Sequence, residues 1–200
     1  MTDSLRERKK LVLREELSVT TVLLARERGL GNIRVEDIVE RVGVSRRTFG
    51  NYFSSKEDAI ADRHVQRVRT AADELLRRPD SEPLWTAITA SLLAPYLADD
   101  AATPSRDEQN GLLAVLSTAD MQSAVDRGAR AATALFAEAI ATRVGASAHK
   151  DPLPGVLATA ALSTLLTTLE FWVGCDEPEP LQQLLRTAFD RLGTGFDRLS

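Results

Sequence analysis

The 200-residue chain has one cysteine, Cys175, and two histidines, His64 and His149. A single cysteine excludes an intrachain disulfide and a four-cysteine zinc site, and it is more often a packed hydrophobe than a nucleophile. The two histidines are far apart in the sequence, and neither has a nearby Cys or His at the spacing of metal ligands. The sequence therefore predicts no metal site and no cofactor.

Signatures of catalysis are missing as well. The chain has no phosphate-binding GxxxxGKS/T loop, no GxSxG elbow, no HExxH pair and no acidic calcium loop. The adjacent carboxylates Asp99 and Asp100 stand beside Thr103 and Pro104, which is typical of a solvated loop. We therefore expect that the protein is not an enzyme.

Long apolar segments are also absent from the pattern. No apolar run approaches the ~20 residues of a membrane span. The first residues, Met1 to Arg6, lack the apolar core of a signal peptide. With 44% hydrophobic and 27% charged residues, the composition is that of an ordinary globular protein. We expect a cytoplasmic protein without a membrane partner.

Strand-like alternation is missing, and the whole chain has the pattern of an all-α protein. Helical spacing, caps and breakers predict a series of helices separated by Gly, Pro and polar loops. A loop is expected at 98–106, and Pro95 is expected to kink or end the helix that contains it. The expected helices cover residues 4–28, 35–42, 46–52, 55–78, 83–95, 106–117, 120–144, 152–173 and 181–199.

Residues 43–60 carry the most informative pattern in the chain. The apolar residues of 35–42 recur at helical spacing and end at Gly43, the residue type preferred just past a helix end. Ser45 offers an N-cap oxygen to a second short helix. Two short helices joined by a Gly-containing turn predict a helix-turn-helix, whose second helix enters the DNA major groove.

The second helix of this motif separates inward from outward side chains. Phe49 and Phe53 are four positions apart and share the inward face. The outward residues suit DNA, because Arg forks to guanine, Asn pairs with adenine, and Thr and Tyr reach phosphate oxygens. Lys56 begins the next helix, whose N-terminus is a natural phosphate site. We therefore predict DNA contacts from Ser45, Arg46, Arg47, Thr48, Asn51, Tyr52 and Lys56.

The charge distribution is uneven along the chain. Residues 1–69 hold 15 Lys/Arg and 11 Asp/Glu, a balance of +4, whereas residues 70–200 hold 10 and 18, a balance of −8. A basic N-terminal part on an acidic remainder fits local binding to phosphates. Chance asymmetry among solvated helix faces explains the charges equally well.

The same residues resemble a known family. The similarity to the DNA-binding region of TetR-family transcriptional regulators covers residues 8–62 and rests on Val35-Glu36-Asp37-Ile38, Gly43-Val44-Ser45, Thr48-Phe49, Tyr52-Phe53 and Ser55-Lys56-Glu57. Two positions depart from the family pattern. Arg34 replaces the Ser or Thr that usually caps the first helix of the motif, with Asn32 as an alternative cap. Gly50 replaces an aromatic residue, at a cost of about 1 kcal/mol relative to Ala and with the loss of a phosphate-contacting hydroxyl.

The resemblance implies a two-domain organisation and a mode of action. A three-helix helix-turn-helix domain is expected over residues 1–64, and a helical effector-binding and dimerisation domain over residues 65–200. The family further implies a homodimer on a palindromic operator, acting as a repressor that a small molecule releases. The helices expected at 152–173 and 181–199 are apolar beyond the needs of one core face, so we expect them to form the dimer interface, with Leu185 and Phe189 as candidate contacts.

Five large aromatic residues lie in the second domain, and each fits either core packing or the lining of a ligand cavity. We expect at least one of them to line a cavity for the effector. Few charges occur in 152–173, which predicts a mostly apolar effector, with Glu170 as the one partner for a cationic amphiphile. The five are Trp85, Tyr96, Phe136, Phe171 and Trp172.

Two alternatives from other classes stay open at this point. The chain could be a helical ligand-carrier or interaction protein whose helix-turn-helix no longer binds DNA, or an enzyme on a helical scaffold. A gel shift against the DNA flanking its own gene separates both from a transcriptional regulator.

Overall fold

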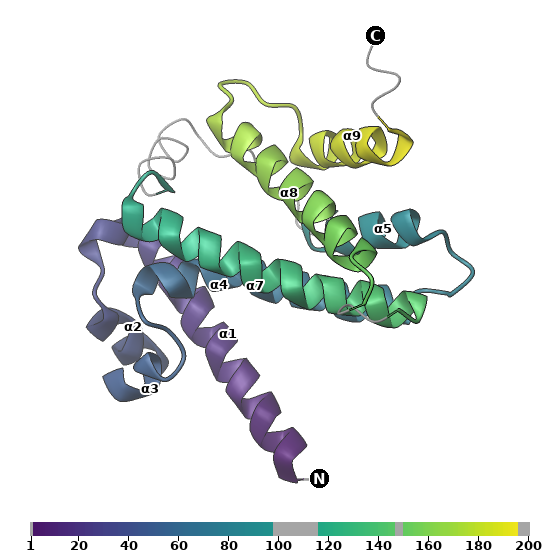
Figure 1. The fold of residues 1–200 in the computed structure, drawn as a ribbon. Coiled ribbons are helices and arrows are strands. Elements are labelled where there is room, and N and C mark those ends of the chain that lie inside the picture. Colours follow the sequence, from purple (N-terminus) through teal and green to yellow (C-terminus); the bar gives the residue numbers. More distant parts are fainter. Residues whose placement is uncertain (1, 98–115, 147–149, 196–200) are drawn as a thin grey trace. The chain divides into compact units, whose positions relative to one another are not determined.

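The structure is a computed structural model that describes residues 2–97, 116–146 and 150–195. Its regular elements in these ranges are all helical, which confirms the predicted fold class (Figure 1). The helix expected at 106–117 and the loop expected at 98–106 fall almost wholly outside the described residues. The elements are α1 (Thr2–Arg28), η1 (Leu30–Asn32), α2 (Val35–Val42), α3 (Arg46–Gly50), α4 (Lys56–Arg77), α5 (Leu84–Leu97), α7 (Ala119–Val144), α8 (Leu153–Gly174) and α9 (Leu181–Thr194).

The described chain divides into two compact units. The first contains residues 2–66 and 116–128, and the second contains 67–97, 129–146 and 150–195. The division therefore falls inside both α4 and α7. It differs from the predicted domains 1–64 and 65–200 chiefly in the start of α7, which groups with the helix-turn-helix.

Several helix ends differ from the sequence-based expectations. Helix α3 ends at Gly50, two residues before the end predicted from the sequence, and Asn51 takes its C-cap position. Pro95 lies inside α5, which continues to Leu97, so this proline does not end the helix. Proline has no backbone donor, so α5 continues to Leu97 without the hydrogen bond that an amide at residue 95 would give to the carbonyl of Ser91.

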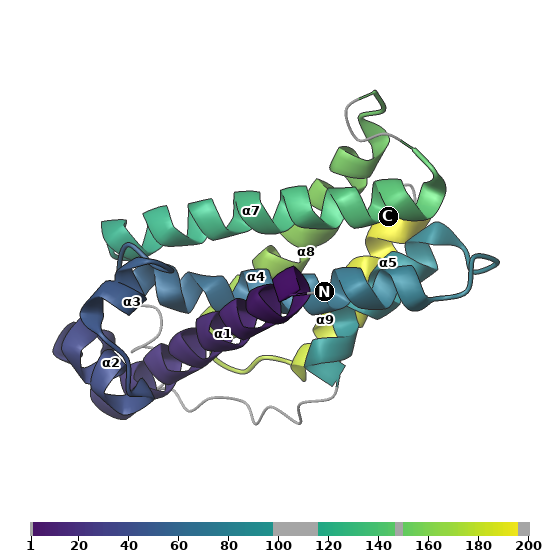
Figure 2. The same cartoon turned by 90° about the horizontal axis from the view of Figure 1, so that it is seen from below.

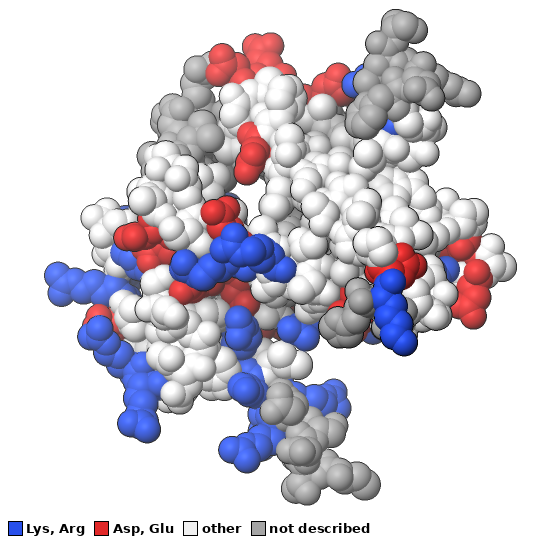
Figure 3. Space-filling model, in the orientation of Figure 1, with Lys and Arg blue, Asp and Glu red and all other residues white. Residues whose placement is uncertain are grey.

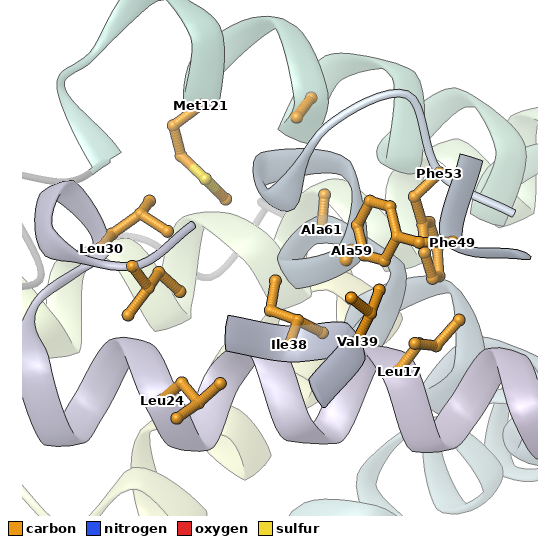
Figure 4. Close-up of a cluster of buried hydrophobic side chains, with 12 residues drawn as sticks. Leu17, Leu24, Leu30, Ile38, Val39, Phe49, Phe53, Ala59, Ala61 and Met121 are labelled. Carbon is orange, nitrogen blue, oxygen red and sulfur yellow. The ribbon is translucent and has the colours of Figure 1, made fainter. Parts of the chain in front are cut away.

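Buried side chains of the first unit converge from α1, α2, α3, the start of α4 and the start of α7 (Figure 4). Figures 1 and 2 both show α2 and α3 beside the C-terminal part of α1, and α2 packs directly on α1. The apolar stripe of α1 thus supports the helix-turn-helix. The cluster is formed by Leu17, Leu24, Leu30, Ile33, Ile38, Val39, Phe49, Phe53, Ala59, Ala61, Met121 and Ala124.

The second unit has a core of its own, in which α9 packs against both α8 and α5. Its largest fully buried side chains come from the C-terminal part of α4 and from α5, α7, α8 and α9, among them Leu75, Ile88, Phe136, Leu162 and Phe189. Burial of apolar surface is the main favourable term in folding. The unit therefore holds together by apolar packing between five helices, α4, α5, α7, α8 and α9.

Arg143 of α7 stabilises the C-terminal end of α4 inside the second unit. Its Nη1 donates to the carbonyl oxygens of Leu75 and Arg78, both at 2.9 Å, and its Nη2 donates to the carbonyl of Pro79 at 2.6 Å. The last carbonyls of a helix lack intrahelical partners, and a guanidinium satisfies them well. Arg78 in turn donates to both carboxylate oxygens of Glu82, and these hydrogen bonds hold the pKa of that carboxyl below its ordinary value.

Helix α8 corrects the expectation that no apolar segment of the chain approaches the length of a membrane span. Its 22 residues are long and apolar enough to cross a membrane by length and composition alone. Buried residues along α8, including Ala158, Leu162 and Leu165, pack within the second unit. A core helix of a soluble protein passes the same test of length and composition, so the segment is weak support for a membrane span.

Candidate nucleic-acid interface

The turn between α2 and α3 has the geometry that the sequence predicts. Gly43 adopts φ 78° at the C-cap of α2, a left-handed conformation that glycine reaches without a Cβ penalty. The amides of Gly43 and Val44 both donate to the carbonyl of Val39, at 2.9 and 3.0 Å. Ser45 caps α3, because its Oγ accepts from the amide of Thr48 at 3.0 Å. The chain therefore reverses sharply and presents α3 as a separate short helix.

Two aromatic residues fix which face of α3 points outward. Phe49 and Phe53 are 3% and 5% exposed, and their ring centroids lie 5.6 Å apart. Both belong to the cluster that α1 and α2 support (Figure 4). The opposite face of α3 carries exposed Arg46 and Arg47, as predicted, whereas Tyr52, assigned to the outward set from the sequence, is half-buried and packs against the same cluster.

The structure brings the seven predicted DNA-binding residues together around α3. The side chains of Ser45, Arg46, Arg47 and Asn51 are exposed, and those of Thr48, Tyr52 and Lys56 are half-buried. Most of the Lys and Arg side chains on the face drawn in Figure 3 gather over α1, α2 and α3. A basic surface of this kind suits a phosphate backbone.

The two arginines of α3 have different surroundings. Arg46 Nη1 donates to Glu36 Oε1 of α2 at 2.6 Å. Within the described residues, the side chain of Arg47 makes no ion pair or hydrogen bond. Sequence reasoning missed Glu36, because its position in the first turn of α2 shows no sign of a partner ten residues away.

Lys56 has a structural role in addition to the predicted phosphate contact. Its Nζ donates to the carbonyl oxygens of Leu30 at 2.7 Å and Ile33 at 2.9 Å. These carbonyls belong to the connection between α1 and α2. An ammonium group has three donors, so one remains for a phosphate oxygen, and the phosphate contact stays a prediction.

The start of α2 corrects one expectation and explains how Arg34 is tolerated. Asn32 does not cap α2, because its Nδ2 donates instead to the carbonyl of Arg28 at the end of α1. Asp37 supplies the reciprocal half of a capping box, since its Oδ2 accepts from the amide of Arg34 at 2.7 Å. The missing Ser or Thr is therefore partly compensated by an acidic residue in the first turn.

Gly50 leaves room where the family has an aromatic residue. A Cβ added at Gly50 would meet no atom within 4 Å. The residue is the last of α3 and is exposed. The departure from the family pattern is therefore a lost side chain and not a requirement of packing.

The five aromatic residues predicted to line a ligand site all lie in the second unit. Phe136 is fully buried, Tyr96 and Trp172 are 8% exposed, and Trp85 is half-buried. Phe171 is 58% exposed, so it lies at the protomer surface and not among the buried four. The ring of Trp85 stacks on Phe189 of α9, with centroids 6.0 Å apart.

Some buried polar atoms of the second unit have partners and others have none. The guanidinium of Arg67 lies 5.2 Å from the ring centroid of Tyr96, and burial raises the pKa of the Tyr96 hydroxyl. Trp172 Nε1 and Thr89 Oγ1 are buried without a hydrogen-bond partner among the described residues. A buried donor left unpaired costs about 1–3 kcal/mol, which a bound molecule with an acceptor would recover.

The most exposed large apolar side chains of the second unit lie on α8 and not on the buried stripe of α9. Leu185 and Phe189 are fully buried within the protomer, which corrects their assignment as candidate partner contacts. Leu153, Val156 and Phe171 of α8 are 51%, 59% and 58% exposed. Glu170, which precedes Phe171 in α8, is also exposed, so it is not a buried partner for a cationic ligand.

Comparison with known proteins covers both parts of the chain. Residues 19–61 match the family described as bacterial regulatory proteins, tetR family, and residues 82–197 match the MftR C-terminal domain. A provisionally named mycofactocin biosynthesis transcriptional regulator, MftR, from Mycobacterium tuberculosis is 28% identical, with 96% of each chain covered.

Two solved structures align along most of the chain. The reduced form of NemR from E. coli is 25% identical and aligns with 87% of this chain and 94% of its own, with a TM-score of 0.48. A transcriptional regulator of the TerR/AcrR family from Aquifex aeolicus is 17% identical and aligns with 90% and 98%, also with a TM-score of 0.48. The two matched domain families carry more weight than these alignments.

Proposed function

The chain belongs to the tetR family of bacterial regulatory proteins, and from this premise we propose that it is a repressor that a small molecule releases from a palindromic operator. Members of this family are soluble regulators of transcription that bind operator DNA, form dimers and respond to small-molecule effectors. In the proposal, the protein works in the cytoplasm, where bacterial DNA lies, and it carries out no catalytic step.

The observation that carries the DNA-binding assignment is the exposed, cation-bearing face of α3, opposite the anchored Phe49 and Phe53. Arg47 has no partner within the described residues, so no internal contact has to break when it binds DNA. We assign base reading to at least one of Arg46 and Arg47, because the N-terminal residues of a recognition helix approach base edges. Thr48 lies on the same helix, and Asn51 is its C-cap residue.

The experiment that tests this assignment uses a duplex selected by the wild-type protein from a random-sequence library. Arg47→Ala should weaken binding by about 1–3 kcal/mol and relax the preference at one base pair. Arg69→Ala, which removes an exposed arginine from the second unit, is the matched control and should leave binding nearly unchanged. Wild-type affinity in folded Arg46→Ala/Arg47→Ala protein would contradict the site assignment.

The remaining predicted contacts are assigned to the DNA backbone. Ser45 and Thr48 hydroxyls lie 2.8 Å apart at the start of α3, and Tyr52 and Lys56 follow it. Backbone contacts fix the register of the protein on the duplex without reading its sequence. Lys56→Ala should weaken binding to all DNA sequences about equally. It should also make the slope of log affinity against log salt concentration shallower by roughly 1.

We propose a homodimer held by α8 and α9, with the exposed apolar residues of α8 at its centre. Obligate dimer interfaces are large and more hydrophobic than ordinary protein surface. In the dimer, two copies of α3 would bind half-sites one DNA turn apart, about 34 Å. An effector that prefers another spacing would shift the equilibrium only by its difference in affinity between the two states.

The effector is assigned to the second unit as a mostly apolar molecule with at least one hydrogen-bond acceptor. Support comes from the buried or half-buried aromatics Trp85, Tyr96, Phe136 and Trp172, and from the unpaired donor Trp172 Nε1. A tight ligand raises the melting temperature by mass action, so a thermal-shift screen finds candidates, and release of the selected duplex identifies the effector. Screening that yields no ligand able to release DNA would favour a constitutive DNA binder.

The target genes are proposed from the M. tuberculosis relative, whose name refers to regulation of mycofactocin biosynthesis. The relative covers 96% of this chain, and residues 82–197 match the MftR C-terminal domain. We therefore expect binding to DNA upstream of mycofactocin biosynthesis genes in the genome that encodes this chain. A gel shift that detects binding only upstream of unrelated genes would contradict this assignment and leave the DNA-binding function intact.

A further inference from the structure

Glu36 of α2 holds the first arginine of the recognition helix. The contact joins Arg46 Nη1 to Glu36 Oε1 at 2.6 Å, between side chains that are 75% and 56% exposed. Glu36 and Arg46 are ten residues apart and are brought together by the turn at Gly43. The carboxylate therefore occupies a donor of Arg46 on the surface assigned to DNA.

This ion pair contributes little to holding the motif together. Exposed pairs add only about 0–1 kcal/mol to stability. The α2–α3 turn has its own hydrogen bonds, and Val39 and Phe49 join the two helices in the buried cluster. Glu36 also lies in the first turn of α2, where its charge stabilises the helix N-terminus by about 0.3–1 kcal/mol whether or not it contacts Arg46. An acidic side chain beside a phosphate backbone is unfavourable for DNA binding, so neither helix stability nor DNA affinity requires the contact with Arg46.

We infer that Glu36 is a positioning residue that competes with DNA for Arg46 and thereby lowers the affinity of the protein for its operator. The inference rests on the proposed DNA-binding role of α3. To reach a phosphate or a guanine edge with Nη1, Arg46 has to leave the Glu36 carboxylate. Arg47 has no such competitor within the described residues, so the two adjacent arginines would contribute differently to binding.

The experiment measures binding of Glu36→Gln to two duplexes, one selected by the wild-type protein and one of random sequence. Glutamine keeps the size of the side chain and removes its charge, so Arg46 is released without a loss of packing. Affinity for the selected duplex should rise roughly two- to fivefold, which corresponds to the strength of an exposed pair. The slope of log affinity against log salt should become steeper by up to about 0.9, the value for one additional neutralised phosphate.

Glu40→Gln is the matched control, because Glu40 is exposed on the same helix and has no ion pair within the described residues. It removes the same charge without releasing an arginine, and its effect measures general repulsion from DNA. In an Arg46→Ala background, the gain from Glu36→Gln should fall to the level of Glu40→Gln. A gain on both duplexes would identify Arg46 as a backbone contact, and a gain on the selected duplex alone would identify it as a base reader; both support the competition.

The competition is overturned if Glu36→Gln leaves wild-type affinity unchanged, or if its gain persists in full after Arg46→Ala. It is also overturned if Glu40→Gln gives the same gain as Glu36→Gln. Wild-type protein that binds neither duplex, and selects none from the library, overturns the proposed function itself. Circular dichroism and thermal unfolding of each variant show whether the fold is retained.

Discussion

Arg14 of α1 and Asp62 of α4 form a bidentate ion pair inside the first unit. Arg14 Nε and Nη2 donate to Asp62 Oδ1 at 3.0 and 2.8 Å, and Nε also lies 3.1 Å from Oδ2. The Arg14 guanidinium also lies 5.0 Å from the ring centroid of Phe53, just after the recognition helix. One side chain therefore links α1 to α4 and to the segment that anchors α3.

We predict that Arg14→Met destabilises the protein more than Asp62→Asn does. The Asp62 side chain is 2% exposed, so removing Arg14 leaves a buried carboxylate whose one remaining partner among the described residues is the amide of Gln66. Breaking a buried ion pair costs about 3–5 kcal/mol. Because the Arg14 side chain is 36% exposed, we expect Arg14→Met to lower the free energy of unfolding by roughly 2 kcal/mol. Urea unfolding measures the difference, and Arg63→Met, whose contact with Glu15 is 3.7 Å long, should cost less than about 1 kcal/mol.

Gly50→Tyr should strengthen DNA binding without disturbing the fold. The space around Gly50 is open, and replacing a glycine reduces the conformational freedom of the unfolded backbone. Gly50→Ala is the control for backbone entropy and should raise stability by up to about 1 kcal/mol. Only the tyrosine adds a hydroxyl that can reach a phosphate, so a gain in affinity limited to Gly50→Tyr is expected in a gel shift. An equal gain for both variants would assign the effect to helix stability.

Gly193→Ala should displace Trp85 and loosen the second unit. A Cβ at Gly193 would overlap the pyrrole edge of the Trp85 indole, whose Nε1 donates to the carbonyl of Phe189 at 3.3 Å. Overpacking of this kind costs about 1–3 kcal/mol. Fluorescence in a Trp172→Phe background reports on Trp85 alone and should shift to the red. Gly174→Ala, where a Cβ meets nothing within 4 Å, should leave that spectrum unchanged.

The local part of the fold followed from the sequence, and the long-range contacts did not. Gly43, Ser45 and Phe49 act within a few residues of the chain, so spacing and residue type sufficed to predict the turn, the cap and the inward face. The pair of Trp85 with Phe189 spans 104 positions and depends on how α5 and α9 pack. The two carbonyls bound by Lys56 likewise become visible only when the α1–α2 connection is folded.

Polar partners were the least predictable feature of the candidate interface. Helical periodicity placed Arg46 and Arg47 on one outward face but could not distinguish them, because the difference between them comes from Glu36 of the neighbouring helix. The apolar pattern of the sequence alone wrongly assigned Leu185 and Phe189 as partner contacts, since an apolar stripe looks the same whether it packs inside the protomer or against a partner.

Burial of Tyr96 should make the protein less stable at alkaline pH. Desolvation disfavours the tyrosinate and raises the pKa of Tyr96 above its ordinary value of about 10, although the nearby Arg67 opposes the shift. Above that ordinary value the unfolded chain has lost this proton and the folded chain keeps it, so stability falls as the pH rises toward the raised pKa. Tyr96→Phe should flatten this alkaline decline in urea unfolding. Tyr52→Phe, which removes the other tyrosine, leaves an absorbance titration that reports on Tyr96 alone.

Phe171→Glu should separate the proposed dimer into folded monomers. Phe171 and Val156 are exposed on α8 in the single protomer, so a charge there meets solvent in the monomer and an apolar partner in the dimer. Burying an unpaired carboxylate at an interface is strongly unfavourable, and analytical ultracentrifugation should show the loss of the dimer. Phe189→Glu is the contrasting variant, because Phe189 is fully buried and its substitution should unfold the protomer instead. If Phe171→Glu remains dimeric while its helical content is intact, this face of α8 is not the interface, and the pairing of the two operator-binding helices must be held elsewhere.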